Sequence, residues 1–518
     1  MVASSVPIAS AAGVETLQRG GNAIDAALAM AATLCVVEPM STGLGGDLFA
    51  LVHSASEGRL LSLNASGRAP AAATREAYLE RGRDHVPMRG ILSTTVPGAI
   101  HGWETLSRRL GALPLADVLA PAIRAAEDGF PVTEMVSHYW SLLPSVLSND
   151  AARATWLPGG RAPAAGETFR CPGQARTLRA IGKGGARAFY RGEAAEAIVA
   201  TSQAEGGFFE PVDLANHEST WTEPITSDYR GVTVAEHPPN GQGLAALVGL
   251  NVLARLGDPV SPTSTLDWHR RIEASKLAYA DRDAYIADPE HADVPIEALL
   301  EPGYADRRAA LVGDEALDAP GPGLHAGDTI YCCAADEHGN LVSLIQSLYM
   351  AFGSGVACGD TGVILQNRGA CFRLEAGHPN VLAPGKRPFH TIIPGMLLRD
   401  GTPFMPFGIM GGDIQAQAHL AFVGNLVDHG LNPQEALDRP RFRFVEGRQV
   451  VLEEPDLPVD EGGTLREALT ERGHEVLGPG EAVIDVFGGG QAIERHANGT
   501  LAGASDRRKD GCALGWWG

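Results

Sequence analysis

Thr329 is the residue of this 518-residue chain whose type and position best fit a chemical role. It precedes an apolar run, 330–335, which predicts a buried strand, and a turn cluster with a second apolar run follows at 336–348. If the turn centres on His338, the two strands form a hairpin in which Thr329 lies opposite Ser347. Two hydroxyl groups would then face each other across the strand pair.

A threonine hydroxyl is a poor nucleophile at neutral pH, but it becomes a good one when the chain is cut directly before it. The new α-amino group titrates at about 8 and can accept the hydroxyl proton. β-Branched residues also commonly begin strands, so Thr329 has a purely structural interpretation as well.

The glycine pair Gly411-Gly412 is a second feature that could take part in chemistry. It follows the apolar run 407–410 and precedes Asp413. Consecutive glycines let the backbone come close to a ligand and can turn two N–H groups toward a developing oxyanion. An ordinary turn is the alternative interpretation.

These segments resemble the γ-glutamyltransferase family of self-cleaving N-terminal-nucleophile hydrolases. Residues 328–349 resemble the start of that family's small subunit, and residues 1–4, 20–27 and 43–47 resemble parts of its large subunit. The remaining similar segments occur in the same order along the chain, at 96–99, 281–283, 352–355, 362–367, 411–412 and 503–506. The resemblance therefore covers essentially the whole chain.

The resemblance implies a fold, a maturation step and catalytic residues. The implied fold is of the α+β class, a four-layer αββα sandwich. Cleavage between Asp328 and Thr329 would give a large subunit, residues 1–328, and a small subunit, residues 329–518, which remain together as an αβ heterodimer. Thr329 would be the nucleophile, Ser347 would hold its hydroxyl or the freed α-amino group, and Gly411 and Gly412 would form the oxyanion hole. Assembly into a higher homo-oligomer is left open.

The chain departs from the transferases at the positions that hold a γ-glutamyl group. Tyr349 stands in place of an asparagine, Arg368 in place of a glutamine or glutamate, and Cys371 in place of the aspartate that pairs with the substrate's ammonium. His390 and Thr391 replace two serines that bind the carboxylate. A cation at position 368 would repel an ammonium a few ångströms away by on the order of 1–4 kcal/mol. We therefore expect poor binding of γ-glutamyl groups.

The carboxylate-binding side of the site is retained in altered form. Arg68 lies two residues from the position of the family's substrate-binding arginine, and on an extended segment this shift keeps the side chain on one face. Arg68 and Arg368 are expected to hold an anion, because a guanidinium can bind a carboxylate with two parallel hydrogen bonds. The pattern resembles the branch of the family that includes oxamate amidohydrolase and acylases.

The predicted function is an autoprocessing threonine-nucleophile hydrolase that cleaves an amide of a small, oxamate-like carboxylate-bearing substrate. Three alternatives stay open. The first is a γ-glutamyl transferase or hydrolase acting on glutathione-type compounds, and the second is a C–C hydrolase that removes an oxalyl-type group. The third is a non-catalytic binding member of the family.

Composition narrows the classes of partner. The formal net charge of −21 argues against a nucleic-acid or anionic-membrane surface. The seven cysteines, an odd number, do not suggest a disulfide framework, and no His-Glu-x-x-His motif is present, so neither a metal nor another cofactor is expected. The longest apolar stretch, 26–37, is too short to cross a bilayer, and no signal-type segment is visible, which predicts a cytoplasmic enzyme.

Periodicity predicts the main helices that surround these residues. The patterns fall at 22–37 with Asn22 as N-cap, 115–127 with a break at Pro121, 244–256, and 269–287. Residues 43–46 are glycine-rich, but a strand-like run follows them instead of a helix, so a dinucleotide-binding loop is rejected. The segment 318–323, rich in proline and glycine, is the obvious linker before Thr329.

Overall fold

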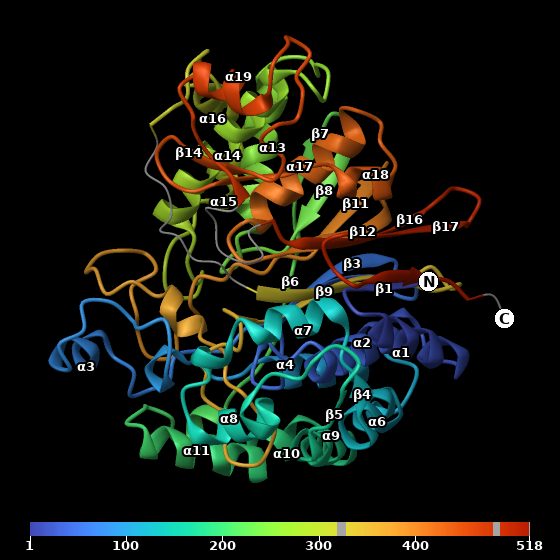
Figure 1. Cartoon of the computed structure of the whole chain (residues 1–518), viewed down its shortest axis with the longest axis vertical. Helices are drawn as coiled ribbons and strands as arrows, with labels where there is room; N and C mark the ends of the chain where they lie inside the picture. Colours follow the sequence, from blue (N-terminus) through green and yellow to red (C-terminus); the bar gives the residue numbers. More distant parts are fainter. Residues whose placement is uncertain (319–327, 480–486, 517–518) are drawn as a thin grey trace.

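Two antiparallel β-sheets pack face to face at the centre of the chain (Figure 1). The computed structural model describes residues 1–318, 328–479 and 487–516, with only the backbone at Asp328. The larger sheet has the strand order β18-β1-β9-β10-β2-β3-β6, and the second has the order β17-β16-β12-β11-β8-β7. The larger sheet therefore combines strands from both ends of the chain with those that flank Thr329.

The strands of the larger sheet are β1 (Val2–Ser4), β2 (Asp47–Ser54), β3 (Arg59–Ala65), β6 (Thr220–Thr222), β9 (Asp328–Ala335), β10 (Leu341–Tyr349) and β18 (Cys512–Leu514). Those of the second sheet are β7 (Ile225–Tyr229), β8 (Val232–Glu236), β11 (Gly395–Arg399), β12 (Thr402–Met410), β16 (Gly489–Arg495) and β17 (Leu501–Ser505). The short strands β13 (Phe442–Phe444), β14 (Gln449–Leu452) and β15 (Glu475–Leu477) form one small sheet, and β4 (Phe130–Pro131) and β5 (Thr168–Phe169) form another.

The hairpin of β9 and β10 has the predicted register over most of its length. Leu341 pairs with Ala335 and Gln346 with Ile330, which centres the turn on His338 as predicted. The register shifts between Gln346 and Tyr349, so the strand pair is irregular at the point where Thr329 and Ser347 lie. Residues 329–335 and 341–349 are buried on both faces of the hairpin, because helices cover one side of their sheet and the second sheet covers the other.

One buried cluster joins the facing sides of the two sheets. Phe49 of β2 and Tyr331 of β9 lie in the same cluster as Ala235 of β8, Met396 of β11 and Ile493 of β16. All five side chains are fully buried. The interface between the sheets is therefore part of the hydrophobic core, and it places the end of β12 close to β9 and β10.

Helices pack on the outer side of each sheet (Figure 1). The helices α1 (Pro7–Gln18) and α2 (Ala23–Val37) lie against the larger sheet, and α13 (Gly243–Arg255), α14 (Thr265–Tyr285) and α17 (Gln415–Val427) lie on the side of the second. All residues of α2 are buried, as expected for a helix that is apolar all round. Asn22 caps it together with Asp25 in a capping box, which confirms the predicted start.

The remaining α-helices have the following bounds. They are α3 (Arg75–Glu80), α4 (Ala99–Leu110), α5 (Leu115–Val118), α6 (Ala120–Asp128), α7 (Glu134–Ser141), α8 (Asp150–Trp156), α9 (Pro172–Gly184), α10 (Ala186–Tyr190), α11 (Glu193–Ala204), α12 (Pro211–Ala215), α15 (Ile296–Leu300), α16 (Pro302–Ala309), α18 (Pro433–Asp438) and α19 (Leu465–Glu471). No helix in the described ranges is long and apolar enough to cross a membrane.

Two predicted boundaries need correction. The pattern at 115–127 breaks at Leu119 and not at Pro121, because Pro121 lies in the first turn of α6, where a missing N–H costs no helical hydrogen bond. Helix α14 begins at Thr265, ahead of the predicted 269, because the Ser264 side chain caps it by accepting the Leu266 N–H. Except for Asp318, the predicted linker 318–323 lies outside the described residues.

Candidate active site

Thr329 and Ser347 are in contact through their hydroxyl groups. Both residues are buried, and their Oγ atoms lie 3.1 Å apart. The Ser347 Oγ also accepts the backbone N–H of Tyr349 at 2.7 Å. That bond leaves the Ser347 hydroxyl its proton, which it can donate. The predicted hydroxyl pair is therefore present, although it lies in the region where the strand register shifts.

Arg368 joins Tyr349 and Thr391 beside this hydroxyl pair. Its guanidinium lies 4.1 Å from the centre of the Tyr349 ring, and its Nη1 donates to the Thr391 Oγ1 at 2.9 Å. Arg368 is only 1% exposed, and its Nη2 has no hydrogen-bond partner in the described part of the chain. A buried guanidinium with an unfilled donor is positioned for an acceptor that the protein does not supply.

Tyr349 adopts a backbone conformation that few non-glycine residues adopt. Its φ is +78°, at the end of β10. This conformation is disfavoured for a bulky side chain, and strained residues of this kind recur at functional sites. Here it accompanies the register shift and the placement of the ring beneath Arg368.

His390 faces a buried carboxylate, Asp47. The His390 Nε2 lies 3.2 Å from the Asp47 Oδ2, and its Nδ1 accepts the Ile392 N–H at 3.4 Å. Burial lowers the pKa of His390 well below its ordinary value, so the ring is neutral and its Nε2 carries the proton. Because both ring nitrogens are engaged by the protein, a direct contact between His390 and substrate stays a prediction.

Asp47 is a residue that the sequence did not single out. It begins β2, lies opposite Ser347 in the sheet, and its Oδ1 accepts the N–H groups of Gly67 and Gly98, both at 3.0 Å. Burial raises its pKa to about 7, although the positive charge of Arg368 opposes this shift. The sequence signals were its place at the end of the family-like segment 43–47 and directly before an apolar strand.

Gly411 and Gly412 form the turn that follows β12. Their φ values are +130° and +69°, in the region that favours glycine. Within the described ranges neither N–H donates a hydrogen bond, while the Gly412 carbonyl accepts one from the Gln242 side chain at 3.1 Å. Two N–H groups without acceptors suit an oxyanion hole. That role stays a prediction.

A cavity of about 550 Å³ opens between Tyr349 and Asp413, the residue that follows the glycine pair. Tyr349, Cys371, Arg282 and Asp413 are among the residues that line it. The Asp413 Oδ1 lies 3.2 Å from the Arg282 Nη1, and its buried Oδ2 has no hydrogen-bond partner among described residues. Although Cys371 replaces the family's aspartate, the cavity still has a carboxylate, because Asp413 supplies one from another part of the chain.

The structure does not bring Arg68 into this set. Its Nη2 donates to both carboxylate oxygens of Glu290 at 2.9 Å, and its Nη1 donates to the Gly385 carbonyl at 2.9 Å. Arg387 donates to the same glutamate at 2.8 Å. These contacts support a structural role, so substrate binding by Arg68 stays a prediction that its acidic partner weakens.

One buried cluster has metal-type donors. Side-chain atoms of His269, Glu273 and His474 lie within 4.8 Å of one another. However, the Lys276 Nζ lies 2.8 Å from the Glu273 Oε1, so a lysine ammonium already supplies the positive charge there. The lysine also donates to the Leu317 carbonyl. We therefore assign this cluster a structural role.

Comparisons with known proteins identify the family of this chain. The model of the family described as Gamma-glutamyltranspeptidase matches residues 9–516. The chain is 39% identical to "Glutathione hydrolase-like YwrD proenzyme" of Bacillus subtilis (strain 168), over 99% of this chain and 98% of that protein. It is also 39% identical to "Oxamate amidohydrolase proenzyme" of Klebsiella pneumoniae subsp. pneumoniae, over 98% of this chain and 97% of that protein.

A solved structure shows the same fold. The crystal structure of cephalosporin acylase from Bacillus halodurans superposes with a TM-score of 0.93 at 45% identity, and the match covers 100% of this chain and 96% of that one. The chain therefore belongs to the gamma-glutamyltranspeptidase family and is a hydrolase proenzyme of the N-terminal-nucleophile type.

Proposed function

We propose that the chain cleaves itself between Asp328 and Thr329 and then hydrolyses an amide whose acyl part carries a carboxylate, as in oxamate. The observation that carries this proposal is the buried, unfilled Nη2 of Arg368 in the hydrogen-bonded set beside Thr329 and Ser347. The similarity to a protein named oxamate amidohydrolase supports the same substrate class.

Maturation would begin with attack of the Thr329 hydroxyl on the Asp328 carbonyl. The acyl group moves from nitrogen to oxygen, and water hydrolyses the resulting ester, which frees the α-amino group of Thr329. The large subunit, residues 1–328, would stay bound to the small one, residues 329–518. In one sheet, β9 and β10 of the small subunit lie between β1 and β2 of the large one. We infer that the two sheets and their outer helices form the four-layer αββα sandwich.

Substrate hydrolysis would use the same hydroxyl. The free α-amino group of Thr329 accepts the hydroxyl proton, and the oxygen attacks the amide carbonyl. The N–H groups of Gly411 and Gly412 stabilise the oxyanion, and Arg368 holds the substrate's carboxylate. The amine leaves with the proton, and water then hydrolyses the ester on Thr329.

A second candidate is hydrolysis of γ-glutamyl amides. The observation in its favour is Asp413, whose buried Oδ2 lacks a hydrogen-bond partner in the described residues and which lines the cavity with Tyr349 and Cys371. A carboxylate there could pair with a substrate ammonium. Arg282 already pairs with the other oxygen of Asp413, which reduces the charge available to a ligand.

Three amides separate these candidates. Oxamate, glutaryl p-nitroanilide and γ-glutamyl p-nitroanilide should be given to the purified, processed protein, because the last two differ only by one amino group. The proposal expects higher kcat/KM for oxamate or the glutaryl compound. Faster turnover of the γ-glutamyl compound than of both others would favour the second candidate. Hydrolysis of none of the three would overturn both.

A further inference from the structure

Gln242 connects the glycine turn to the segment that carries Thr391. It immediately precedes α13 and is fully buried. Its Nε2 donates to the Thr391 carbonyl at 2.6 Å and to the Gly412 carbonyl at 3.1 Å, and its backbone N–H donates to the His390 carbonyl at 3.0 Å. One side chain therefore bridges two segments that belong to different parts of the site.

Arg282 fixes the orientation of the Gln242 amide. The Arg282 Nη1 lies 3.1 Å from the Gln242 Oε1, and a guanidinium can only donate, so this atom must be the amide oxygen. The two other partners are carbonyls, which can only accept and so require the amide nitrogen. Arg282 is itself held by Asp413 and Asp283 and lies 4.2 Å from the Tyr279 ring.

The bridge links the two groups that the proposed reaction places at opposite ends of the acyl group. Thr391 receives its second hydrogen bond from the Arg368 Nη1, through Oγ1, at 2.9 Å. A continuous path thus runs from the carboxylate-binding guanidinium through Thr391 and Gln242 to the Gly412 peptide. All the side chains on this path are buried, so a lost hydrogen bond is not replaced by water. Without Gln242, the Gly412 carbonyl would keep only the Gln415 N–H, at 3.2 Å, among the described residues.

We propose that Gln242 is a positioning residue that sets the orientation of the Gly411-Gly412 turn relative to Arg368. The inference rests on the proposed function, because it takes the glycine pair as the oxyanion hole. The Gly412 carbonyl is held by Gln242 together with the Gln415 N–H. Holding the peptide after Gly412 limits the rotation of the preceding peptides, whose N–H groups are those of Gly411 and Gly412. Gln242 acts through these groups and touches no substrate atom.

Gln242→Met and Gln242→Glu test the proposal. Methionine keeps the length of the side chain but forms none of the three side-chain hydrogen bonds, and glutamate keeps the acceptor for Arg282 but cannot donate to the two carbonyls. Gln174→Met is the matched control, because Gln174 is also a buried glutamine whose Nε2 donates to a carbonyl, that of Cys35. It lies in α9, among core residues on the outer side of the larger sheet.

The measurements are self-cleavage, melting temperature, and kcat and KM with oxamate and glutaryl p-nitroanilide. We expect both Gln242 variants to mature, with kcat lower by roughly 10- to 100-fold and KM within about threefold, since removal of one oxyanion donor costs on the order of 100-fold or more. Gln174→Met should keep the wild-type kcat. The melting temperatures of the Met variants at 242 and 174 should be similar.

Four results would overturn the inference alone while wild type remains active. They are wild-type kcat in both Gln242 variants, a loss expressed only in KM, folded Gln242 variants that fail to self-cleave, or insolubility of both when Gln174→Met is soluble. The last two would show that Gln242 serves the fold or maturation. A wild-type protein that self-cleaves but hydrolyses neither probe would overturn the proposed function, and the inference with it.

Discussion

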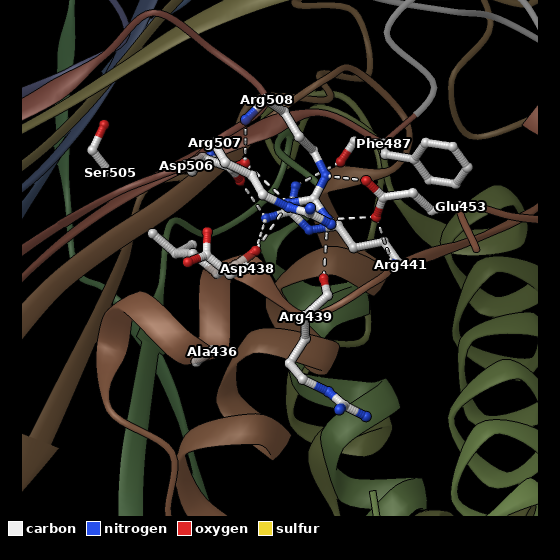
Figure 2. A network of polar contacts seen from close by, with 12 residues as sticks. Ala436, Asp438, Arg439, Arg441, Glu453, Phe487, Ser505, Asp506, Arg507 and Arg508 are labelled. Carbon is white, nitrogen blue, oxygen red and sulfur yellow. Dashed lines mark hydrogen bonds and ion pairs between the residues drawn. The ribbon is translucent and has the colours of Figure 1, made fainter. Parts of the chain in front are cut away.

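Two polar networks in this chain, one partly and one fully buried, differ in how completely their hydrogen bonds are filled. The first, here called the arginine cluster, consists of Arg441, Glu453, Asp506 and Arg508 (Figure 2). The second surrounds Thr329 and includes Arg368, Thr391 and Gln242. Both contain buried guanidinium groups, yet they differ in what remains unpaired.

Every charged side chain of the arginine cluster is used by the protein. Arg441 donates to Asp506 and to the carbonyls of Leu437 and Phe487, and Arg508 bonds to Glu453, Asp506 and two carbonyls (Figure 2). Although burial raises the pKa of Asp506, Arg441 and Arg508 together hold it below its ordinary value. No buried side-chain nitrogen or oxygen of these four residues is left without a hydrogen-bond partner among the described residues.

The network around Thr329 retains unused hydrogen-bonding groups. The Arg368 Nη2 and the Asp413 Oδ2 have no hydrogen-bond partner among the described residues. The N–H groups of Gly411 and Gly412 donate no hydrogen bond there either. Buried polar groups are normally paired, and of these unpaired groups Asp413 lines the cavity of about 550 Å³, with Gly411 and Gly412 directly before it in the chain. Arg368 stacks on Tyr349, which also lines the cavity. The comparison thus separates a network whose buried polar groups are all paired from one that keeps unpaired groups, which is the difference expected if only the second binds a ligand.

Among the substitutions that test this comparison, one in the arginine cluster should lower the free energy of unfolding most and kcat least. Arg508→Met leaves Glu453 and Asp506 short of a buried counter-charge, which typically costs about 3–5 kcal/mol. Urea denaturation in a Thr329→Ala background, where the chain stays in one piece, measures the change in the free energy of unfolding. In the processed enzyme, kcat per folded molecule should stay near the wild-type value. A large fall in kcat would show that the cluster also shapes the site.

A side chain at Gly411 should nearly abolish turnover. A Cβ there would lie 2.8 Å from Ile414 Cγ2 and 3.0 Å from Gly488 Cα, and φ is +130°. Gly411→Ala should therefore displace the turn and lower kcat by about 100-fold. The control is Gly430→Ala, where φ is +63° but no atom lies within 4 Å. Equal activity of the two variants would argue against an oxyanion role for the pair.

The two arginines predicted from the sequence should differ in their effect. Arg368→Ala removes the unfilled donor and should lower kcat/KM by roughly 30-fold, the equivalent of about 2 kcal/mol. Arg68→Ala removes a partly exposed pair with Glu290 and should change kcat/KM by less than about threefold. Self-cleavage should persist in both. A larger effect at Arg68 than at Arg368 would restore the sequence-based assignment of Arg68.

The raised pKa of Asp47 predicts a smaller, pH-dependent change in the free energy of unfolding. Its folded pKa of about 7 exceeds the ordinary value of 3.8, so the folded state binds the proton more tightly than the unfolded state. The stability that it contributes is present at low pH and is lost as the pH rises through 7. Relative to Asp47→Asn, the wild type should lose on the order of 1–4 kcal/mol between pH 4 and 8. If the urea midpoints of the wild type and of Asp47→Asn changed equally between pH 4 and 8, the prediction would be contradicted.

Local patterns predicted the parts of this molecule that local chemistry determines. The hairpin around His338, the Thr329–Ser347 contact and the capped helix α2 depend on residues close in sequence or on one strand pair. The contacts missed join distant segments: Asp47 to His390, Gln242 to Gly412, and Arg68 to Glu290. No periodicity encodes such pairs, because tertiary packing alone brings them together.

The central claim is that Thr329 becomes an N-terminal nucleophile. Intact mass spectrometry with N-terminal sequencing of the purified chain, beside Thr329→Ala, tests it most directly. The account predicts two chains for the wild type, residues 1–328 and 329–518, with the smaller beginning Thr-Ile-Tyr, and one uncut chain for Thr329→Ala. A wild type that stays intact, or a Thr329→Ala chain that still divides at this bond, would contradict it.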